Sequence, residues 1–218
     1  MKNSLIITQG SQAIQLIREL FSLNYRPDNL LVYTVESKAN KSFLEFLKYY
    51  NINYIITNKD KINYDIKTII NKIDLVISFS NPFILSEDNL QKSTFINFHP
   101  GLLPYYKGSF STVYSMINGE KNVGGTWHYI NKEVDKGNII TTITIPIEED
   151  STAFSLNHKI FSSGIQQLEK VIKLVNKNFK GITQDQEGKF YLNKFPDLEQ
   201  IKDENLKNKL YFFPPNYI

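Results

Sequence analysis

The sequence predicts a Rossmann-like α/β fold: a mostly parallel sheet with helices on both faces, plus a C-terminal β-hairpin. Short, continuously apolar runs alternate along the chain with segments whose apolar residues recur at helical spacing. Strands that are buried on both faces of a parallel sheet are apolar throughout, so this order favours an α/β sheet. The alternating segment 182–194, which contains Glu187-Gly188, favours the hairpin.

The apolar runs give the predicted strands in order. These strands cover residues 4–8, 30–35, 54–57, 74–78, 95–99, 125–130 and 138–146. The periodic segments give the predicted helices, which cover residues 12–23, 41–50, 109–117 and 152–179. Ser151 or Thr152 is expected to cap the last of these helices, and Gly181 is expected to close it.

Length and composition indicate one ordinary globular domain with a short appendage. The chain has 218 residues, of which 41% are hydrophobic and 22% charged. We expect a catalytic domain over residues 1–181 and a hairpin with a tail over residues 182–218. Because an isolated hairpin is marginally stable in water, this appendage must lie on the main body or on a partner chain.

Several classes of protein are disfavoured by the composition. The net charge of +3 is too small for the clustered basic surface of a nucleic-acid-binding protein. No apolar run is long enough to cross a bilayer, and the N-terminus lacks the apolar length of a signal peptide. The chain has no cysteine, which excludes disulfides and thiolate zinc sites and fits a reducing cytoplasm.

The most informative segment runs from Asn97 to Pro104 and reads Asn-Phe-His-Pro-Gly-Leu-Leu-Pro. On a strand, Asn97 and His99 face the same side, and Pro100 then interrupts regular pairing. An amide and an imidazole should therefore project together from the carboxyl end of a parallel strand, where open α/β sheets bind ligands.

A second polar segment lies between the last two predicted strands, where Asp135 precedes Lys-Gly in a turn. An amide, an imidazole and a carboxylate without a thiol suit the attack of an amine on an activated carbonyl. The amide N–H donates to the developing oxyanion, the imidazole takes the amine proton, and the carboxylate stabilises the charged imidazole. Alternatives are a structural histidine, a simple Asp turn, or a metal site formed by His99, His128 and Asp135, although no two-His spacing supports the metal.

These segments resemble the folate-dependent formyltransferase family, whose pattern is Asn-x-His-Pro-x-Leu-Leu-Pro followed by an Asp-x-Gly turn. The resemblance covers about residues 70–175 well, and the first 70 residues in outline. It implies that Asn97 holds the formyl oxygen, that His99 is the general base and that Asp135 completes the triad. The implied donor is N10-formyltetrahydrofolate. The positions expected to bind it are Phe83, Ile84, Leu85, Leu102 and Val134.

Three branches of that family differ in the amine that they formylate. The purine-pathway branch, which formylates glycinamide ribonucleotide, has a Gly-x-Gly-Ser-Asn loop where this chain has Gln9-Gly10-Ser11-Gln12. That branch also has a histidine in the helix after Leu-Leu-Pro, which is missing here. The initiator methionyl-tRNA branch adds a C-terminal domain of roughly 100 residues, about one small domain, for which this chain has no room.

The third branch formylates amino groups of nucleotide-linked sugars and resembles this chain in the loop after Leu-Leu-Pro, the hairpin and the closing Phe-Pro-Pro. The resemblance implies a dTDP-linked 4-amino-4,6-dideoxyhexose as substrate, as in the synthesis of O-antigen sugars of lipopolysaccharide, and a homodimer formed through the hairpin. The positions expected to contact the sugar nucleotide are Ser80, Asn81, Tyr105, Tyr106 and Lys107. The purine-pathway enzyme and a folate or nucleotide-sugar binding module without catalysis remain alternatives.

Overall fold

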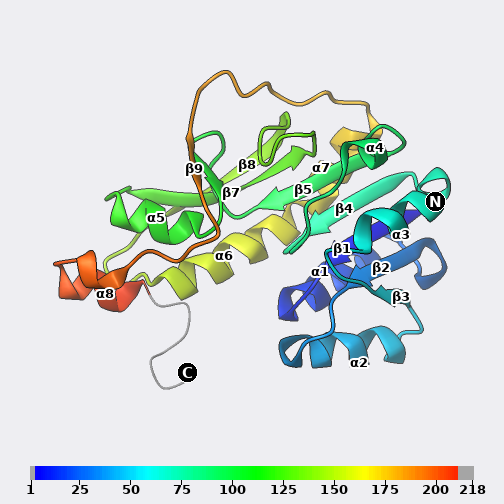
Figure 1. The fold of residues 1–218 in the computed structure, drawn as a ribbon, viewed down its shortest axis with the longest axis horizontal. Coiled ribbons are helices and arrows are strands. Elements are labelled where there is room, and N and C mark those ends of the chain that lie inside the picture. Colours follow the sequence, from blue (N-terminus) through cyan, green and yellow to red (C-terminus); the bar gives the residue numbers. More distant parts are fainter. Residues whose placement is uncertain (1–2, 211–218) are drawn as a thin grey trace.

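A seven-stranded sheet forms the centre of the protein, in the order β3-β2-β1-β4-β5-β7-β8 (Figure 1). This computed structural model describes residues 3–210. The first five strands run parallel, whereas β7 and β8 are antiparallel to their neighbours. The predicted mostly parallel sheet is therefore confirmed.

The observed strands lie close to the predicted ones. They are β1 (Ser4–Thr8), β2 (Leu30–Thr34), β3 (Asn53–Ile56), β4 (Leu75–Phe79), β5 (Thr94–His99), β7 (Asn122–Tyr129) and β8 (Ile139–Pro146). A separate two-stranded sheet pairs β6 (Tyr106–Gly108) with β9 (Lys189–Tyr191).

The helices include three, α3, α4 and α8, that the apolar periodicity did not predict. The α-helices are α1 (Ser11–Ser22), α2 (Lys41–Tyr49), α3 (Ile62–Ile69), α4 (Glu87–Leu90), α5 (Ser111–Ile117), α6 (Ala153–Gln166), α7 (Leu168–Asn176) and α8 (Glu204–Lys209). Short 3-10 helices are η1 (Pro27–Asn29), η2 (Lys38–Asn40), η3 (Ile70–Lys72) and η4 (Leu198–Gln200). Among the described helices none is long and apolar enough to span a membrane.

Both faces of the sheet are buried because successive strand residues point to opposite sides. On β1, Ile6 belongs to the core that is formed with α1, α2, α6 and α7. Its neighbours Leu5 and Ile7 belong to a second core, which is formed with α3 on the other face. The helices therefore cover both faces of the sheet, as predicted.

An aromatic cluster anchors β5 directly beneath the Asn97–His99 pair. The ring of Phe98 lies 5.4 Å from that of Phe79 and 5.2 Å from that of Trp127. Gly164 of α6 packs so closely that an added Cβ would lie 2.4 Å from the Phe98 ring, and its carbonyl accepts a 2.9 Å hydrogen bond from the Trp127 Nε1. The strand that carries the two polar side chains is thus fixed from its opposite face.

The predicted helix over residues 152–179 is interrupted, and its end was placed wrongly. Thr152 caps the first part through a reciprocal capping box with Ser155, as expected. The chain breaks at Gln167, whose side chain accepts a hydrogen bond from Thr141 Oγ1, and α7 ends at Asn176. Asn178, with a φ of 58°, is the left-handed residue that ends the helix, in place of the expected Gly181.

The predicted C-terminal hairpin is wrong for the described residues. β9 pairs in parallel with β6, a strand about 80 residues earlier, and Ile182 instead forms an antiparallel bridge with Ile139. Gly188 does not form a turn between two strands. It allows contact with the main body, because a Cβ there would lie 1.6 Å from the Pro104 carbonyl oxygen. The closing Phe-Pro-Pro lies outside the described residues.

Candidate active site

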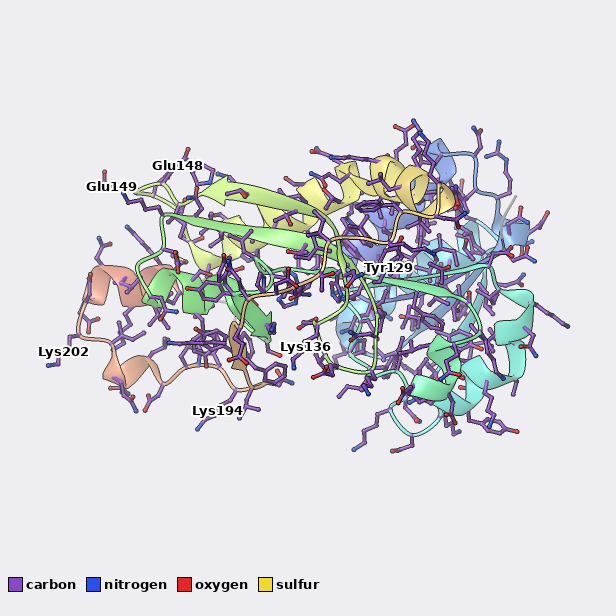
Figure 2. All side chains as sticks on the ribbon, turned by 90° about the horizontal axis from the view of Figure 1, so that it is seen from above. Tyr129, Lys136, Glu148, Glu149, Lys194 and Lys202 are labelled. Carbon is purple, nitrogen blue, oxygen red and sulfur yellow. The ribbon has the colours of Figure 1, made fainter. Side chains whose placement is uncertain are left out.

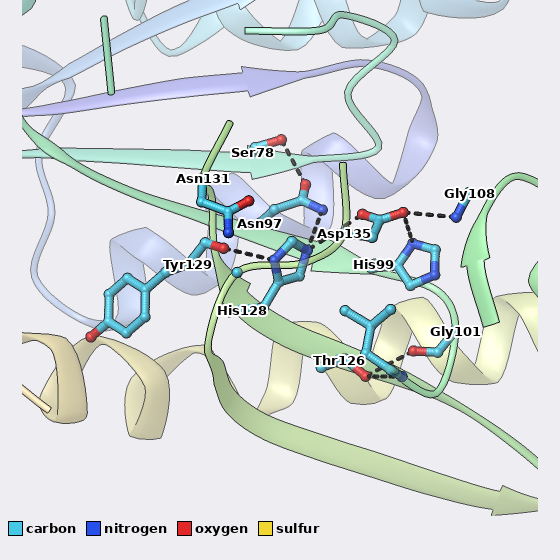
Figure 3. Close-up of polar contacts among 12 residues, drawn as sticks. Ser78, Asn97, His99, Gly101, Gly108, Thr126, His128, Tyr129, Asn131 and Asp135 are labelled. Carbon is cyan, nitrogen blue, oxygen red and sulfur yellow. Dashed lines mark hydrogen bonds and ion pairs between the residues drawn. The ribbon is translucent and has the colours of Figure 1, made fainter. Parts of the chain in front are cut away.

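The candidate site lies where the carboxyl ends of β4 and β5 meet β7 and the loop before β8 (Figure 3). Asn97 and His99 project from β5, and Asp135 comes from the β7–β8 loop. The structure therefore brings together the three residues that the sequence motif singles out.

A chain of hydrogen bonds fixes the amide of Asn97. The Oδ1 of Asn97 accepts from Ser78 Oγ at 2.7 Å, and its Nδ2 lies 3.0 Å from His128 Nε2. His128 Nδ1 is 2.8 Å from the Tyr129 carbonyl oxygen, which can only accept, so Nδ1 carries the proton and Nε2 accepts from Asn97. Nδ2 has two hydrogens, and within the described residues the second one has no acceptor, so this N–H is left for a ligand.

The tautomer of His99 is set by a backbone carbonyl. Its Nε2 lies 2.6 Å from the Tyr106 carbonyl oxygen and must therefore be the protonated nitrogen. The ring is buried against Gly101, where an added Cβ would lie 2.5 Å from Nε2. The Nδ1 lone pair of neutral His99 consequently faces Asp135 Oδ2, at 3.4 Å.

Asp135 lies in a strained turn, and its carboxylate contacts several groups. Its φ is 56°, a left-handed conformation that costs a non-glycine residue on the order of 1–3 kcal/mol. Oδ2 accepts from the Gly108 N–H at 2.8 Å, while Oδ1 lies 3.6 Å from His128 Nε2. The carboxylate therefore lies between the two imidazoles.

Burial and neighbouring charge set the protonation states. Burial lowers the pKa of His99, and the nearby Asp135 carboxylate only partly opposes this shift. Burial alone would raise the pKa of Asp135, but the interaction with His99 and the hydrogen bond from the Gly108 N–H outweigh it and hold this pKa well below its usual range. At neutral pH the site thus contains a neutral imidazole beside an ionised carboxylate.

We expect Asp135→Asn to lower kcat on the order of 10²-fold, because an imidazolium formed at His99 Nδ1 would lose its counter-charge. Since Asp135 raises the pKa of His99, the variant should also shift the acid limb of the kcat–pH profile to lower pH. Steady-state rates across pH measure both effects. Glu133→Gln, an exposed carboxylate paired with Lys136, is the matched control. An acid limb that stays in place or moves upward would contradict this role of Asp135.

The expected substrate-binding residues have different environments. The ring of Tyr106, a position expected to contact the sugar nucleotide, is buried, stacks on Tyr191 and donates its hydroxyl to Glu120. Tyr105 is half exposed and bonds Gln186. Lys107 is only 6% exposed. Within residues 3–210 its side chain has no hydrogen-bond or ion-pair partner.

The β4–α4 loop holds the other expected contacts. Ser80 ends β4 with a φ of 53°. The amide of Asn81 is engaged within the loop, since its Oδ1 accepts from the Phe83 N–H at 2.8 Å and its Nδ2 donates to the Phe83 carbonyl at 3.1 Å. Phe83 and Leu85 are partly buried against the α3-side core, whereas Ile84 is exposed.

Two of the residues expected to bind the formyl donor lie next to the triad in sequence. Val134 is exposed immediately before Asp135. Leu102 is partly buried, and its side chain packs on Gly124. Ile84 and Val134 are exposed apolar residues on the β4–α4 and β7–β8 loops, and such side chains suit the aromatic ring system of a bound ligand.

Sequence reasoning did not predict which hydrogen bonds orient the triad. Ser78 and His128 hold Asn97, and backbone groups of β6 hold His99 and Asp135. The side-chain partners face Asn97 across paired strands, where Ser78 and His128 are its direct register neighbours, so a correct strand order would have predicted them. In the described part of the chain, no group of three His, Cys, Asp or Glu side chains is arranged to hold a metal ion.

The fold and the site define an α/β protein in which an amide, an imidazole and a carboxylate meet at the carboxyl ends of parallel strands. A family model described as formyl transferase matches residues 5–172. The chain belongs to the formyl transferase family.

Individual relatives agree with this assignment. The GDP-perosamine N-formyltransferase of Brucella melitensis is 36% identical over 107 residues, which cover 49% of this chain and 41% of that protein. The crystal structure of WlaRD, a sugar 3N-formyl transferase in the presence of dTDP and 5-N-formyl-THF, is 25% identical, with a TM-score of 0.76 over 91% of this chain and 72% of that one. The phosphoribosylglycinamide formyltransferase of Anaplasma phagocytophilum is 24% identical, with a TM-score of 0.67 over 88% of this chain and 98% of that one, and shares the fold.

Proposed function

We propose that this protein transfers the formyl group of N10-formyltetrahydrofolate to the amine of a nucleotide-linked amino sugar. The observation that carries the proposal is the hydrogen-bond arrangement at the site: a neutral His99 with its lone pair beside Asp135, next to an Asn97 N–H that remains free. These are the groups that amine attack on a formyl carbonyl requires. The chain spans less than half of the Brucella relative, so activity, substrate and partners are proposals.

Each triad residue has a separate task in this proposal. The free N–H of Asn97 donates to the formyl oxygen as negative charge develops on it. His99 accepts the proton of the attacking amine at Nδ1, because Nε2 already donates to Tyr106. Asp135 then receives a charge-assisted hydrogen bond from Nδ1. No side-chain nucleophile is needed, since the amine itself attacks.

The donor fits the surroundings of the triad. Exposed apolar Ile84 and Val134 stand on the two loops that flank the site, and the resemblance adds Phe83, Leu85 and Leu102. The WlaRD structure was obtained with a formyl-tetrahydrofolate, which supports the same donor class here. When bound, this donor supplies a formyl group on a nitrogen that can leave.

Lys107 supports a phosphorylated acceptor. Its side chain is only 6% exposed, and within residues 3–210 its ammonium group forms no ion pair, so it can pair with an anionic ligand. We assign it to the pyrophosphate of the nucleotide sugar, with half-exposed Tyr105, Ser80 and Asn81 as further contacts. The relatives carry GDP and dTDP in their names. Within this class we favour a dTDP-linked 4-amino-4,6-dideoxyhexose, and a cytoplasmic location, where such substrates are made.

An acceptor panel tests the proposal. The purified protein is incubated with N10-formyltetrahydrofolate and, separately, with dTDP- and GDP-linked 4-amino-4,6-dideoxyhexoses and glycinamide ribonucleotide. We expect a formylated product from an amino sugar and none from glycinamide ribonucleotide. The reverse result would establish the purine-pathway alternative. Thermal stabilisation by donor and nucleotide sugar without any formylated product would indicate a binding module instead.

We also propose that residues 1–181 form the catalytic domain and that residues 182–218 contribute the contact of a homodimer. Leu192 is 72% exposed, and Phe190 projects from the edge strand β9 of the small sheet. Apolar side chains on an unpaired strand edge favour association.

The dimer has its own expected result. The mass in solution should be about twice that of one chain, and Phe190→Asp with Leu192→Asp should give monomers, because two buried charges would oppose the contact. Sedimentation or light scattering measures the mass. Tyr64→Asp, at a residue that is also 72% exposed but lies on α3, serves as the control. A monomeric wild type, or a double variant that stays dimeric, would refute the proposal that the β9 edge forms the dimer contact.

A further inference from the structure

The segment after α7 returns to the candidate site along the edge of the sheet. In Figure 1 the C-terminal trace arches from α7 to β9, and Figure 2 shows it crossing the molecule toward Lys194. At its start, Ile182 exchanges two backbone hydrogen bonds with Ile139, each 2.8 Å long. This bridge places the following residues beside the Asp135 turn.

Gln184 makes two hydrogen bonds to that turn. Its Nε2 donates to the carbonyl oxygen of Asp135 at 3.0 Å and to that of Gly137 at 2.7 Å. The other side of the turn is equally close to the body, because a Cβ at Gly137 would lie 1.6 Å from the Tyr129 carbonyl oxygen. The catalytic turn is therefore held between β7 and the side chain of Gln184.

The same segment also holds the second loop of the site. The Lys189 N–H donates to the Tyr105 carbonyl at 3.1 Å, and the Ser109 N–H donates to the Tyr191 carbonyl at 3.0 Å. Between these two bonds lie the Tyr106 carbonyl, which accepts from His99, and the Gly108 N–H, which donates to Asp135. Residues 182–191 thus contact both loops that orient the triad.

We propose that Gln184 is a positioning residue that acts through Asp135. Within residues 3–210 its side chain forms hydrogen bonds only to backbone carbonyls of the turn, and these bonds keep the left-handed Asp135 in place, so that the carboxylate stays beside His99. Its Oε1 is buried and has no hydrogen-bond partner in the described chain, so the function of the amide rests on its two N–H donors. Two carbonyl acceptors need a double donor at this point, which a carboxylate at position 184 cannot provide.

The inference rests on the proposed function, and a substrate-free measurement separates the two. The pKa of His99 can be followed by NMR, since the chain has three histidines. The titratable groups that act on His99 are Asp135, which raises its pKa, and His128, which lowers it. If Gln184 holds the carboxylate in place, Gln184→Ala should lower the pKa of His99 in the direction that Asp135→Asn does, by a smaller amount.

Kinetics provide the second readout. Gln184→Ala should lower kcat about tenfold or more with little change in KM, because a misplacement of about 1 Å costs up to 10²-fold, and Gln184→Glu should lower it at least as much. In an Asp135→Asn background, Gln184→Ala should have no further effect on kcat, since both changes remove one interaction. Gln200→Ala, an exposed glutamine that bonds only Asp197, should leave kcat unchanged.

Two results would overturn the assignment: an unchanged His99 pKa in Gln184→Ala, or a loss of kcat that simply multiplies with that of Asp135→Asn. Lower thermal stability with an unchanged His99 pKa and kcat would reduce Gln184 to a structural residue. A wild type without formyl transfer to any acceptor would overturn the proposed function, while the NMR titration would still decide whether Gln184 positions Asp135.

Discussion

His99→Asn is expected to lower kcat by about 10²- to 10⁴-fold, the range that a positioned general base contributes. Asparagine is too short to replace Nε2 as the donor to the Tyr106 carbonyl, and it has no basic nitrogen lone pair, so the proton of the amine has no acceptor. Single-turnover rates of formyl transfer measure this effect separately from substrate binding and product release.

Folding and donor binding are the controls for that variant. Its thermal unfolding temperature and its affinity for the formyl donor should stay close to those of the wild type, because the side chain is polar in both. If His99→Asn kept the rate within about tenfold, roughly 1.4 kcal/mol, the assignment of His99 as general base would be wrong.

Asn97→Ala is expected to lower kcat by about 10²- to 10³-fold, as does the loss of one oxyanion donor in other acyl transfers. Hydrogen bonds to Ser78 and His128 fix the direction of the free N–H of Asn97. Variants of His128 therefore also test whether this N–H donates to the formyl oxygen. His128→Leu removes the acceptor for the other Asn97 N–H and should also reduce kcat. His128→Gln, whose Oε1 can accept, should recover part of the loss.

The same single-turnover rates apply to this series, and binding of the amino sugar is the control. A truncated Asn97 should affect the rate far more than the dissociation constants, because the hydrogen bond strengthens only as charge develops on the formyl oxygen. A rate within tenfold of the wild type, or equal rates in His128→Leu and His128→Gln, would contradict the role of the aimed amide.

Most of the fold could be predicted because most of the parallel strands of the main sheet are local apolar runs. The C-terminal hairpin could not, since alternation with Glu187-Gly188 has the same local appearance whether a strand pairs with its neighbour or with a distant one. β9 instead pairs with β6, and Gly188 serves close packing on Pro104. Partners far apart in the sequence leave little trace in local periodicity.

The features of the site likewise include some that local sequence predicts and some that it does not. Asn97 and His99 share a strand face, which follows from a period of two residues. The tautomer of His99 depends on a carbonyl of β6, and any residue type at position 106 provides a carbonyl, so no side-chain pattern could indicate it. The ring of Tyr106 packs on Tyr191, a residue 85 positions later, and local sequence does not indicate such a distant partner.

The most direct test follows the formyl carbon. The wild type, His99→Asn and Asn97→Ala are each mixed with ¹³C-formyl-labelled N10-formyltetrahydrofolate and a dTDP-linked 4-amino-4,6-dideoxyhexose, and the carbon is located by NMR. We expect the label on the sugar nitrogen with the wild type, and almost none within the same time with either variant, although both bind the donor. Label that stays on the folate with the wild type, or that reaches the sugar equally fast with His99→Asn, would contradict formyl transfer by this triad.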